Sequence, residues 1–165
     1  MKERQKVKDA YSTALRLLSI RARSVAELEE RLRKYEFTAG ESSPVIERLK
    51  KLGYLDDEKY ALGLAQSRVR NKNWGTLRIT KDLAARGISK DLIQKAISGL
   101  GEQSDRTAAA AALKKWLRSK ASPRLGGDRK TFERAYRHLC ARGFPPQVVM
   151  RLLKTYDIDI PEEDI

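Results

Sequence analysis

The chain has 165 residues, of which 41% are hydrophobic and 35% are charged, and this balance favours helices with broad solvent-exposed faces over a single deep core. Its formal net charge of +13 predicts an anionic partner, with nucleic acid as the leading candidate, because clustered Lys and Arg side chains neutralise phosphates. One cysteine excludes an internal disulfide framework, one histidine leaves no Cys/His set for zinc, and no apolar run can span a bilayer. We therefore expect a cytoplasmic protein without metal, cofactor or membrane contact.

Apolar residues at helical spacing, taken in chain order, predict nine helices. We expect them at residues 6–20, 24–35, 43–52, 57–71, 76–86, 89–99, 104–119, 128–142 and 145–154. Alternating strand patterns are absent, and short connections suit helices that pack on their neighbours. The predicted fold class is therefore all-α.

Several of these helices have recognisable boundary signals. Ser24 and Glu27 form a capping box at the start of the second helix. Ser43 precedes Pro44, which predicts a capping serine followed by proline at the first helical position. Glycine accepts the left-handed backbone that closes a helix, and it stands at three expected helix ends: Gly53, Gly87 and Gly143. These glycines need no catalytic explanation.

A short pattern recurs three times along the chain. Residues 83–88 (Leu-Ala-Ala-Arg-Gly-Ile) resemble residues 139–144 (Leu-Cys-Ala-Arg-Gly-Phe), and more loosely residues 32–37 (Leu-Arg-Lys-Tyr-Glu-Phe). The successive offsets are 51 and 56 residues. Repeats of this length predict units that stack and support one another. We predict three tandem three-helix repeats, at residues 1–55, 56–100 and 101–155.

Two segments differ from the rest in charge. The segment 114–130 is a basic loop that either follows a DNA backbone or is a soluble flexible linker. Its candidate binding residues are Lys114, Lys115, Arg118, Lys120 and Arg124. Residues 156–165 hold five acidic side chains and a proline, so we expect this tail to be disordered.

Three motifs together resemble the RecX family, bacterial regulators of the RecA recombinase. The first contains Leu18, Arg21, Arg23, Ser24, Glu27, Leu28 and Leu32; the second Gly53, Tyr54, Leu55, Asp56, Asp57, Tyr60 and Ala61; the third Gly75, Arg78, Ile79, Leu83, Gly87 and Ile88. They occur in the family's order and spacing over residues 14–97, and a weaker third-repeat match extends to about residue 153. The chain departs from the family at Glu36, where glycine is usual, and in the insertion at 114–130.

The resemblance implies an elongated, curved array of three-helix repeats. It implies that this array lies in the groove of the RecA–DNA filament and restrains the ATPase and strand-exchange activities of the recombinase. Binding of single-stranded and double-stranded DNA is compatible with that role, and we expect the protein to be a monomer.

Basic residues around Trp74 are the main candidates for partner or DNA binding. Guanidinium groups grip phosphates or carboxylates with two parallel hydrogen bonds, and the other interpretation is a solvated face around a core tryptophan. Trp74 itself either stacks on a base, anchors an interface or packs in the core. The candidates in this group are Arg68, Arg70, Lys72, Trp74, Arg78, Lys81 and Arg86.

Arg21 and Arg23 are further candidates, because they precede the first capping box. They either contact a partner or pair with nearby glutamates such as Glu27 and Glu30. Trp116 lies at helical spacing from other apolar residues and is interpreted as core.

No residues form a plausible catalytic set. Asp56 and Asp57 stand at an expected helix start, where carboxylates satisfy free backbone N–H groups. His138 and Cys140 are two positions apart on one helix and do not face each other. We therefore predict a regulator that is not an enzyme, and the alternative is a stand-alone helical module that binds DNA without reading its sequence.

Overall fold

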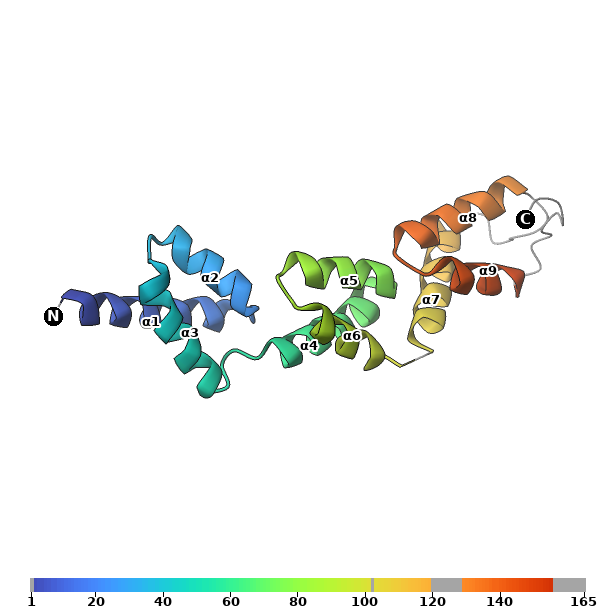
Figure 1. The fold of residues 1–165 in the computed structure, drawn as a ribbon. Coiled ribbons are helices and arrows are strands. Elements are labelled where there is room, and N and C mark those ends of the chain that lie inside the picture. Colours follow the sequence, from blue (N-terminus) through green and yellow to red (C-terminus); the bar gives the residue numbers. More distant parts are fainter. Residues whose placement is uncertain (1, 102, 120–128, 156–165) are drawn as a thin grey trace. The chain divides into compact units, whose positions relative to one another are not determined.

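The computed structural model describes residues 2–101, 103–119 and 129–155, and in these ranges it contains nine helices and no strand (Figure 1). The helices are α1 (Lys2–Ile20), α2 (Val25–Lys34), α3 (Ala39–Lys51), α4 (Asp57–Lys72), α5 (Thr76–Ala85), α6 (Lys90–Ser98), α7 (Ser104–Ser119), α8 (Arg129–Ala141) and α9 (Pro146–Lys154). The predicted all-α fold class is confirmed. None of the helices in these ranges is both long and apolar enough to cross a membrane.

The predicted start of α3 is wrong. The helix begins at Ala39, and Pro44 lies inside it instead of at its first position. Thr38 caps this helix, because its Oγ1 accepts from the Glu41 N–H (3.3 Å) while Glu41 Oε2 accepts from the Thr38 N–H (2.8 Å). This complete capping box lets the helix begin at Ala39, four residues before Ser43. Pro44 lacks an N–H group, and its place inside the helix therefore costs one backbone hydrogen bond.

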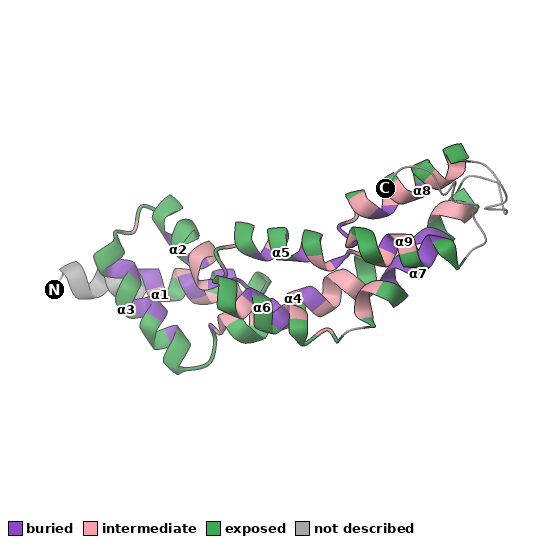
Figure 2. Ribbon diagram, turned by 45° about the vertical axis from the view of Figure 1, so that its right-hand side comes forward, coloured by how far each residue is buried: buried purple, intermediate pink, exposed green. Residues whose placement is uncertain are grey.

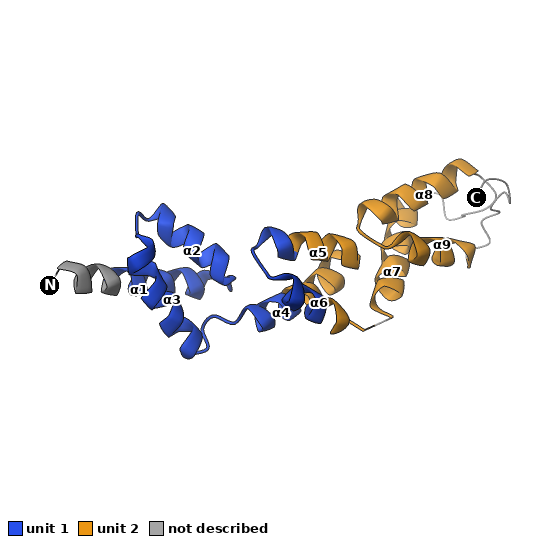
Figure 3. Cartoon of the chain, viewed as in Figure 1, with its two compact units in different colours: residues 1–63, 83–96 blue, residues 64–82, 97–165 orange. Residues whose placement is uncertain are grey.

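The helices form two compact units (Figure 3). Unit 1 consists of residues 1–63 and 83–96, and unit 2 consists of residues 64–82 and 97–165. Helices α4, α5 and α6 contribute residues to both units. These units are a division by spatial contact, whereas the three repeats are a division by sequence pattern, and the repeat boundaries stay a prediction.

The core of unit 1 lies among α1, α2 and α3. Leu28 and Leu32, one helical turn apart on α2, are completely buried, as their spacing predicts. They pack with a row of small and large apolar residues on the other two helices, including Ala14 and Leu49. Buried and exposed residues alternate along these helices, as amphipathic packing requires (Figure 2).

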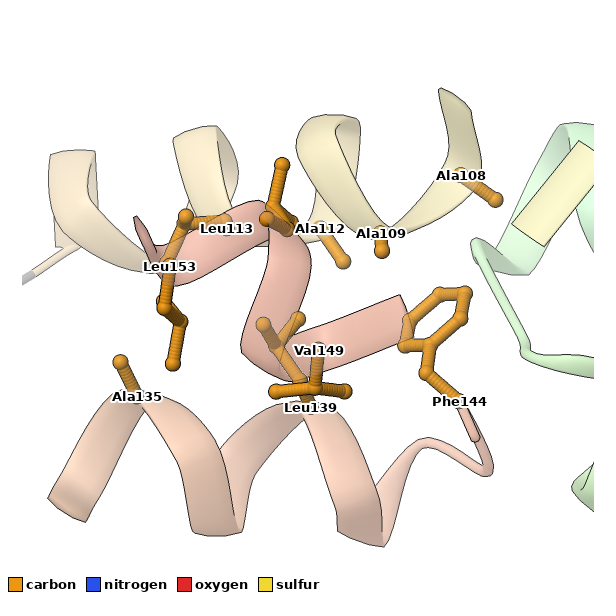
Figure 4. Close-up of a cluster of buried hydrophobic side chains, with 10 residues drawn as sticks. Ala108, Ala109, Ala112, Leu113, Ala135, Leu139, Phe144, Val149 and Leu153 are labelled. Carbon is orange, nitrogen blue, oxygen red and sulfur yellow. The ribbon is translucent and has the colours of Figure 1, made fainter. Parts of the chain in front are cut away.

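The core of unit 2 lies among α7, α8 and α9 (Figure 4). Helix α7 presents alanines to this core, so the facing helices can approach closely. Leu139 of α8 and Val149 of α9 are fully buried beside them. Trp116 is partly buried and packs against the same cluster, which agrees with its predicted core role.

The recurring sequence pattern is a recurring helix end. In each copy the leucine C=O accepts a hydrogen bond from the N–H of the apolar residue five positions later. The residue directly before that apolar residue has a positive φ. The accepting bonds measure 3.2, 3.2 and 3.3 Å, and the φ values are 65°, 75° and 84° for Glu36, Gly87 and Gly143. This is the hydrogen-bond pattern of the Schellman motif, which explains why glycine is favoured there. Glu36 adopts the same conformation with a side chain present.

Candidate functional site

At two places in the fold, the end of one helix meets the start of another. The first junction, in unit 1, joins residues 86–87 after α5 to residues 24–27 at the start of α2. The second junction, in unit 2, joins residues 142–143 after α8 to residues 75–78 at the start of α5. Both are built on the recurring helix end and contain predicted binding residues.

Glu27 is the centre of the first junction. Its carboxylate accepts two hydrogen bonds from Arg21 (3.1 and 3.2 Å) and one from Arg86 Nη1 (2.8 Å). The Tyr60 O–H (3.0 Å) and the Ser24 N–H (3.2 Å) also donate to it. Burial acts to raise the pKa of Glu27, but the hydrogen bonds from Arg21, Ser24 and Tyr60 outweigh it and lower that pKa. The carboxylate is therefore held in its charged form.

Hydrogen bonds between side chains and backbone groups also connect the segments of the first junction. Ser24 Oγ accepts from the Glu27 N–H (3.1 Å) and donates to the Arg86 C=O (2.6 Å). The Val25 N–H donates to Asp57 Oδ1 (2.9 Å). Asp57 thus has the predicted capping role, but the N–H group that it satisfies belongs to α2 and not to α4. Asp56 does cap α4, because its Oδ1 accepts from the N–H of Lys59 (3.0 Å).

Three predicted binding residues therefore have internal partners. Arg21 and Arg86 bind Glu27, as described above. Arg23 is only 7% exposed, and its Nε donates to the Leu17 C=O (3.3 Å). Burial, followed by repulsion from Arg21 and Arg31, lowers the pKa of Arg23.

The second junction brings two backbones into direct contact. The Gly75 N–H donates to the Arg142 C=O (2.9 Å), and the Leu77 N–H donates to the Gly143 C=O (3.0 Å). A Cβ on Gly75 would overlap the Gly143 carbonyl, and a Cβ on Gly143 would overlap Arg78. Both positions therefore require glycine.

Trp74 forms cation–π contacts with two guanidinium groups at this junction. The Cζ atom of Arg78 lies 4.1 Å from the Trp74 ring centroid, and that of Arg68 lies 4.8 Å from it, both within cation–π range. Arg68 also forms an ion pair with Asp82 (2.8 Å). The Arg78 Nη1 donates weakly to the Ala141 C=O at 3.5 Å. Trp74 therefore packs against both arginines.

A basic pocket of about 510 Å³ opens beside this stack. Its lining residues are Asn71, Lys72, Asn73, Trp74, Arg78, Lys115, His138, Ala141 and Arg142. No carboxylate lines the pocket, and its four cationic side chains form no ion pair within the part of the chain that the structure describes. A concave site with this charge suits an oxyanion.

Arg142 is the pocket residue that sequence reasoning missed. Its Nη1 donates to the Lys72 C=O (2.8 Å), and its Nε donates to His138 Nε2 (3.2 Å). The His138 ring stacks on Trp116 with centroids 5.7 Å apart. Arg142 matches Arg86 in the repeat, since both precede the helix-closing glycine, and this correspondence could have identified it.

The structure does not bring the other candidates into the pocket. Arg70 donates to Gln66 Oε1 (3.4 Å), and Lys81 is exposed on α5. Lys114 and Arg118 are exposed on α7, whereas Lys120 and Arg124 lie outside the described residues, as do 120–128 of the basic loop and the acidic tail 156–165. Of the predicted residues, the pocket unites Lys72, Trp74, Arg78 and Lys115.

The ranges that the structure describes contain no candidate metal centre. No group of three or more His, Cys, Asp or Glu side chains there is arranged so that it could hold a metal ion.

Comparisons with known proteins point to one family. Models of the first and second three-helix domains of RecX match residues 10–49 and 56–97. Regulatory protein RecX of Mycolicibacterium smegmatis is 32% identical over 145 residues, which are 86% of this chain and 76% of that protein. Regulatory protein RecX of Pelodictyon phaeoclathratiforme is 36% identical over 86 residues, and the match spans 52% of this chain and 54% of that protein.

A solved structure has the same fold. The crystal structure of RecX from Lactobacillus salivarius superimposes with a TM-score of 0.82 over 94% of this chain and 99% of that chain, at 19% sequence identity. At this level of identity the likeness concerns the fold alone.

Proposed function

Because this chain belongs to the RecX family of regulatory proteins, we propose that it binds the RecA–DNA filament and restrains the ATPase and strand-exchange activities of the recombinase. In this proposal the protein acts by binding, as a cytoplasmic monomer, and catalyses no reaction of its own. The proposal rests on family membership for the partner and on the basic pocket for the contact.

The observation that carries the contact is the charge of the second junction. Lys72, Arg78, Lys115 and Arg142 face one pocket without a carboxylate among its lining residues. A nucleoprotein filament offers phosphates and acidic side chains, which are the groups that such donors bind. At the first junction, in contrast, Arg21 and Arg86 already have Glu27 as a partner. We therefore assign the contact to the second junction.

The test is the single-stranded-DNA-dependent ATPase rate of purified recombinase as this protein is titrated in. We expect the rate to fall at protein amounts well below those needed to coat the DNA. The Arg78→Glu variant should require at least tenfold more protein for the same effect. Arg151→Glu, which makes the same charge change at an exposed position of α9, should behave like the unmodified protein. An unchanged ATPase rate at saturating protein would contradict the proposal.

The alternative function is stand-alone, sequence-independent DNA binding. The net charge of +13 favours it, together with exposed basic side chains on α7 and α8 such as Lys114, Arg118 and Arg134. This function predicts steeply salt-dependent binding to bare DNA, measured by fluorescence anisotropy without recombinase. Loss of ATPase only when the DNA is saturated with protein would favour this alternative over filament regulation.

A further inference from the structure

The two junctions are built from corresponding segments of the repeat and differ in the charge of one central residue. Ser24 and Glu27 at the start of α2 correspond to Gly75 and Arg78 at the start of α5, both at an offset of 51 residues. Arg86 and Arg142 correspond in the same way, since each precedes the glycine that closes its helix. The second junction therefore has an arginine where the first has its central carboxylate.

Among the residues that the structure describes, this exchange leaves Arg142 without a carboxylate partner of the kind that Arg86 has in Glu27. At the first junction, Arg86 donates to a carboxylate that also binds Arg21. At the second, Arg142 donates to the Lys72 C=O and to His138 Nε2, and Arg78 donates to the Ala141 C=O. None of these acceptors carries a negative charge, so they do not balance the two guanidinium charges.

Both arginines are nevertheless held in place. The guanidinium of Arg78 lies over Trp74, and its backbone is packed against Gly143. Arg142 is fixed by its two hydrogen bonds, and one acceptor, His138, is itself stacked on Trp116. Donors that are positioned before a ligand arrives lose little entropy on binding it. The pocket is thus prepared for an oxyanion that the chain does not itself supply.

We propose that the pocket lined by Lys72, Arg78, Lys115 and Arg142 binds a carboxylate side chain from an acidic segment of a protein partner. This carboxylate takes the place at the second junction that Glu27 takes at the first. Glu27 shows what the arrangement accepts, namely a planar carboxylate that receives paired guanidinium hydrogen bonds of 2.8 to 3.2 Å. The inference rests on the proposed function only for the source of the segment, which would be the recombinase.

The test is isothermal titration calorimetry at low salt with the full chain and an acetylated hexaglutamate peptide. We expect Arg142→Gln and Arg78→Gln to weaken peptide binding at least tenfold each. Arg151→Gln, a matched loss of one exposed positive charge, should change it less than twofold. If Arg142→Gln does not fold by circular dichroism, Lys115→Gln at an exposed position on α7 provides the same comparison.

A charge reversal gives the sharper test. Arg78→Glu rebuilds the Glu27 arrangement at the second junction, because the new carboxylate can accept from Arg142. We expect this variant to keep its thermal midpoint and to lose peptide binding entirely. A large fall in the midpoint would contradict the correspondence between the two junctions.

Two outcomes would overturn the assignment of the ligand. If a six-nucleotide oligothymidylate binds more tightly than the peptide and depends on the same arginines, the pocket is a nucleic-acid phosphate site. If the peptide does not bind, or binds equally to all variants, the pocket is not a carboxylate site. None of these measurements uses recombinase, so a negative ATPase result would contradict the proposed function and leave the site standing.

Discussion

The two junctions each join a helix end to a helix start, and they differ in how their charges are balanced. At the first, a carboxylate with a side chain only 17% exposed satisfies Arg21 and Arg86 from within the chain. At the second, the acceptors of Arg78 and Arg142 are two carbonyls and an imidazole nitrogen, and both arginines face a pocket. In one copy of the repeat the arginines form ion pairs within the chain, and in another they line a candidate binding pocket. The exchange of Glu27 for Arg78 is the difference that changes the charge balance.

The largest expected effect comes from the backbone contact of the second junction. Gly143→Ala should lower the free energy of unfolding by about 3 kcal/mol or more, because a Cβ there meets Arg78 backbone atoms and the residue has a positive φ. Urea unfolding followed by circular dichroism measures this loss. Gly53→Ala is the matched control, since it has a positive φ with nothing within 4 Å, and it should cost about 1 kcal/mol. Equal losses for both variants would show that the contact contributes nothing.

The next effect tests the carboxylate of the first junction. Glu27→Gln should lower the free energy of unfolding by about 2 kcal/mol, because Arg21 and Arg86 lose their charged acceptor in a partly buried site. Chemical denaturation gives the value. Glu30→Gln is the control, since Glu30 pairs with Lys34 on the exposed face of α2 and should matter little. A loss no greater than that of the control would mean that the first junction does not depend on its ion pairs.

The same carboxylate predicts an acid dependence of stability. The pKa of Glu27 in the folded state is lowered from 4.5, so its contribution is fully present above about pH 4.5 and is lost as pH falls through the folded-state value. Thermal midpoints measured between pH 6 and pH 3 should therefore fall more steeply for the unmodified protein than for Glu27→Gln. Parallel curves for the two proteins would contradict a lowered pKa at this position.

The smallest effect concerns the helix end that lacks glycine. Glu36→Gly should raise the free energy of unfolding by about 0.5 to 1 kcal/mol, because a φ of 65° strains a residue with a Cβ, while added freedom in the unfolded chain offsets part of the gain. Differential scanning calorimetry should show a small rise in the midpoint. Glu36→Ala is the control and should give no such rise, since alanine keeps the Cβ. A fall in the midpoint of Glu36→Gly would show that the Glu36 side chain is itself stabilising.

Local signals in the sequence were enough to locate the helices. Apolar spacing placed Leu28 and Leu32 in the core, and the Ser24 capping box was identified correctly. The predicted start of α3 was wrong because the chain carries two capping signals close together, Thr38 with Glu41 and Ser43 with Pro44, and the helix uses the first. Competing local signals of similar strength cannot be ranked without tertiary context.

The candidate site was predictable only in part. Basic composition around Trp74 made Lys72 and Arg78 candidates, and the basic segment 114–130 added Lys115. Charge alone could not tell that Arg21 and Arg86 are balanced internally. Whether an arginine faces a carboxylate or a pocket depends on residues far away in sequence, as the separation of 59 positions between Glu27 and Arg86 shows.

The sequence by itself determined the all-α fold class, the recurring helix ends and the excess of positive charge, because helical spacing, capping and composition are local or additive properties. Only the tertiary structure decided which charges are paired. It placed Glu27 between two arginines, left Arg78 and Arg142 facing a pocket, and turned Asp57 toward another helix. Electrostatic pairing depends on distances of a few ångströms between residues that are remote in the chain, and those distances exist only after folding.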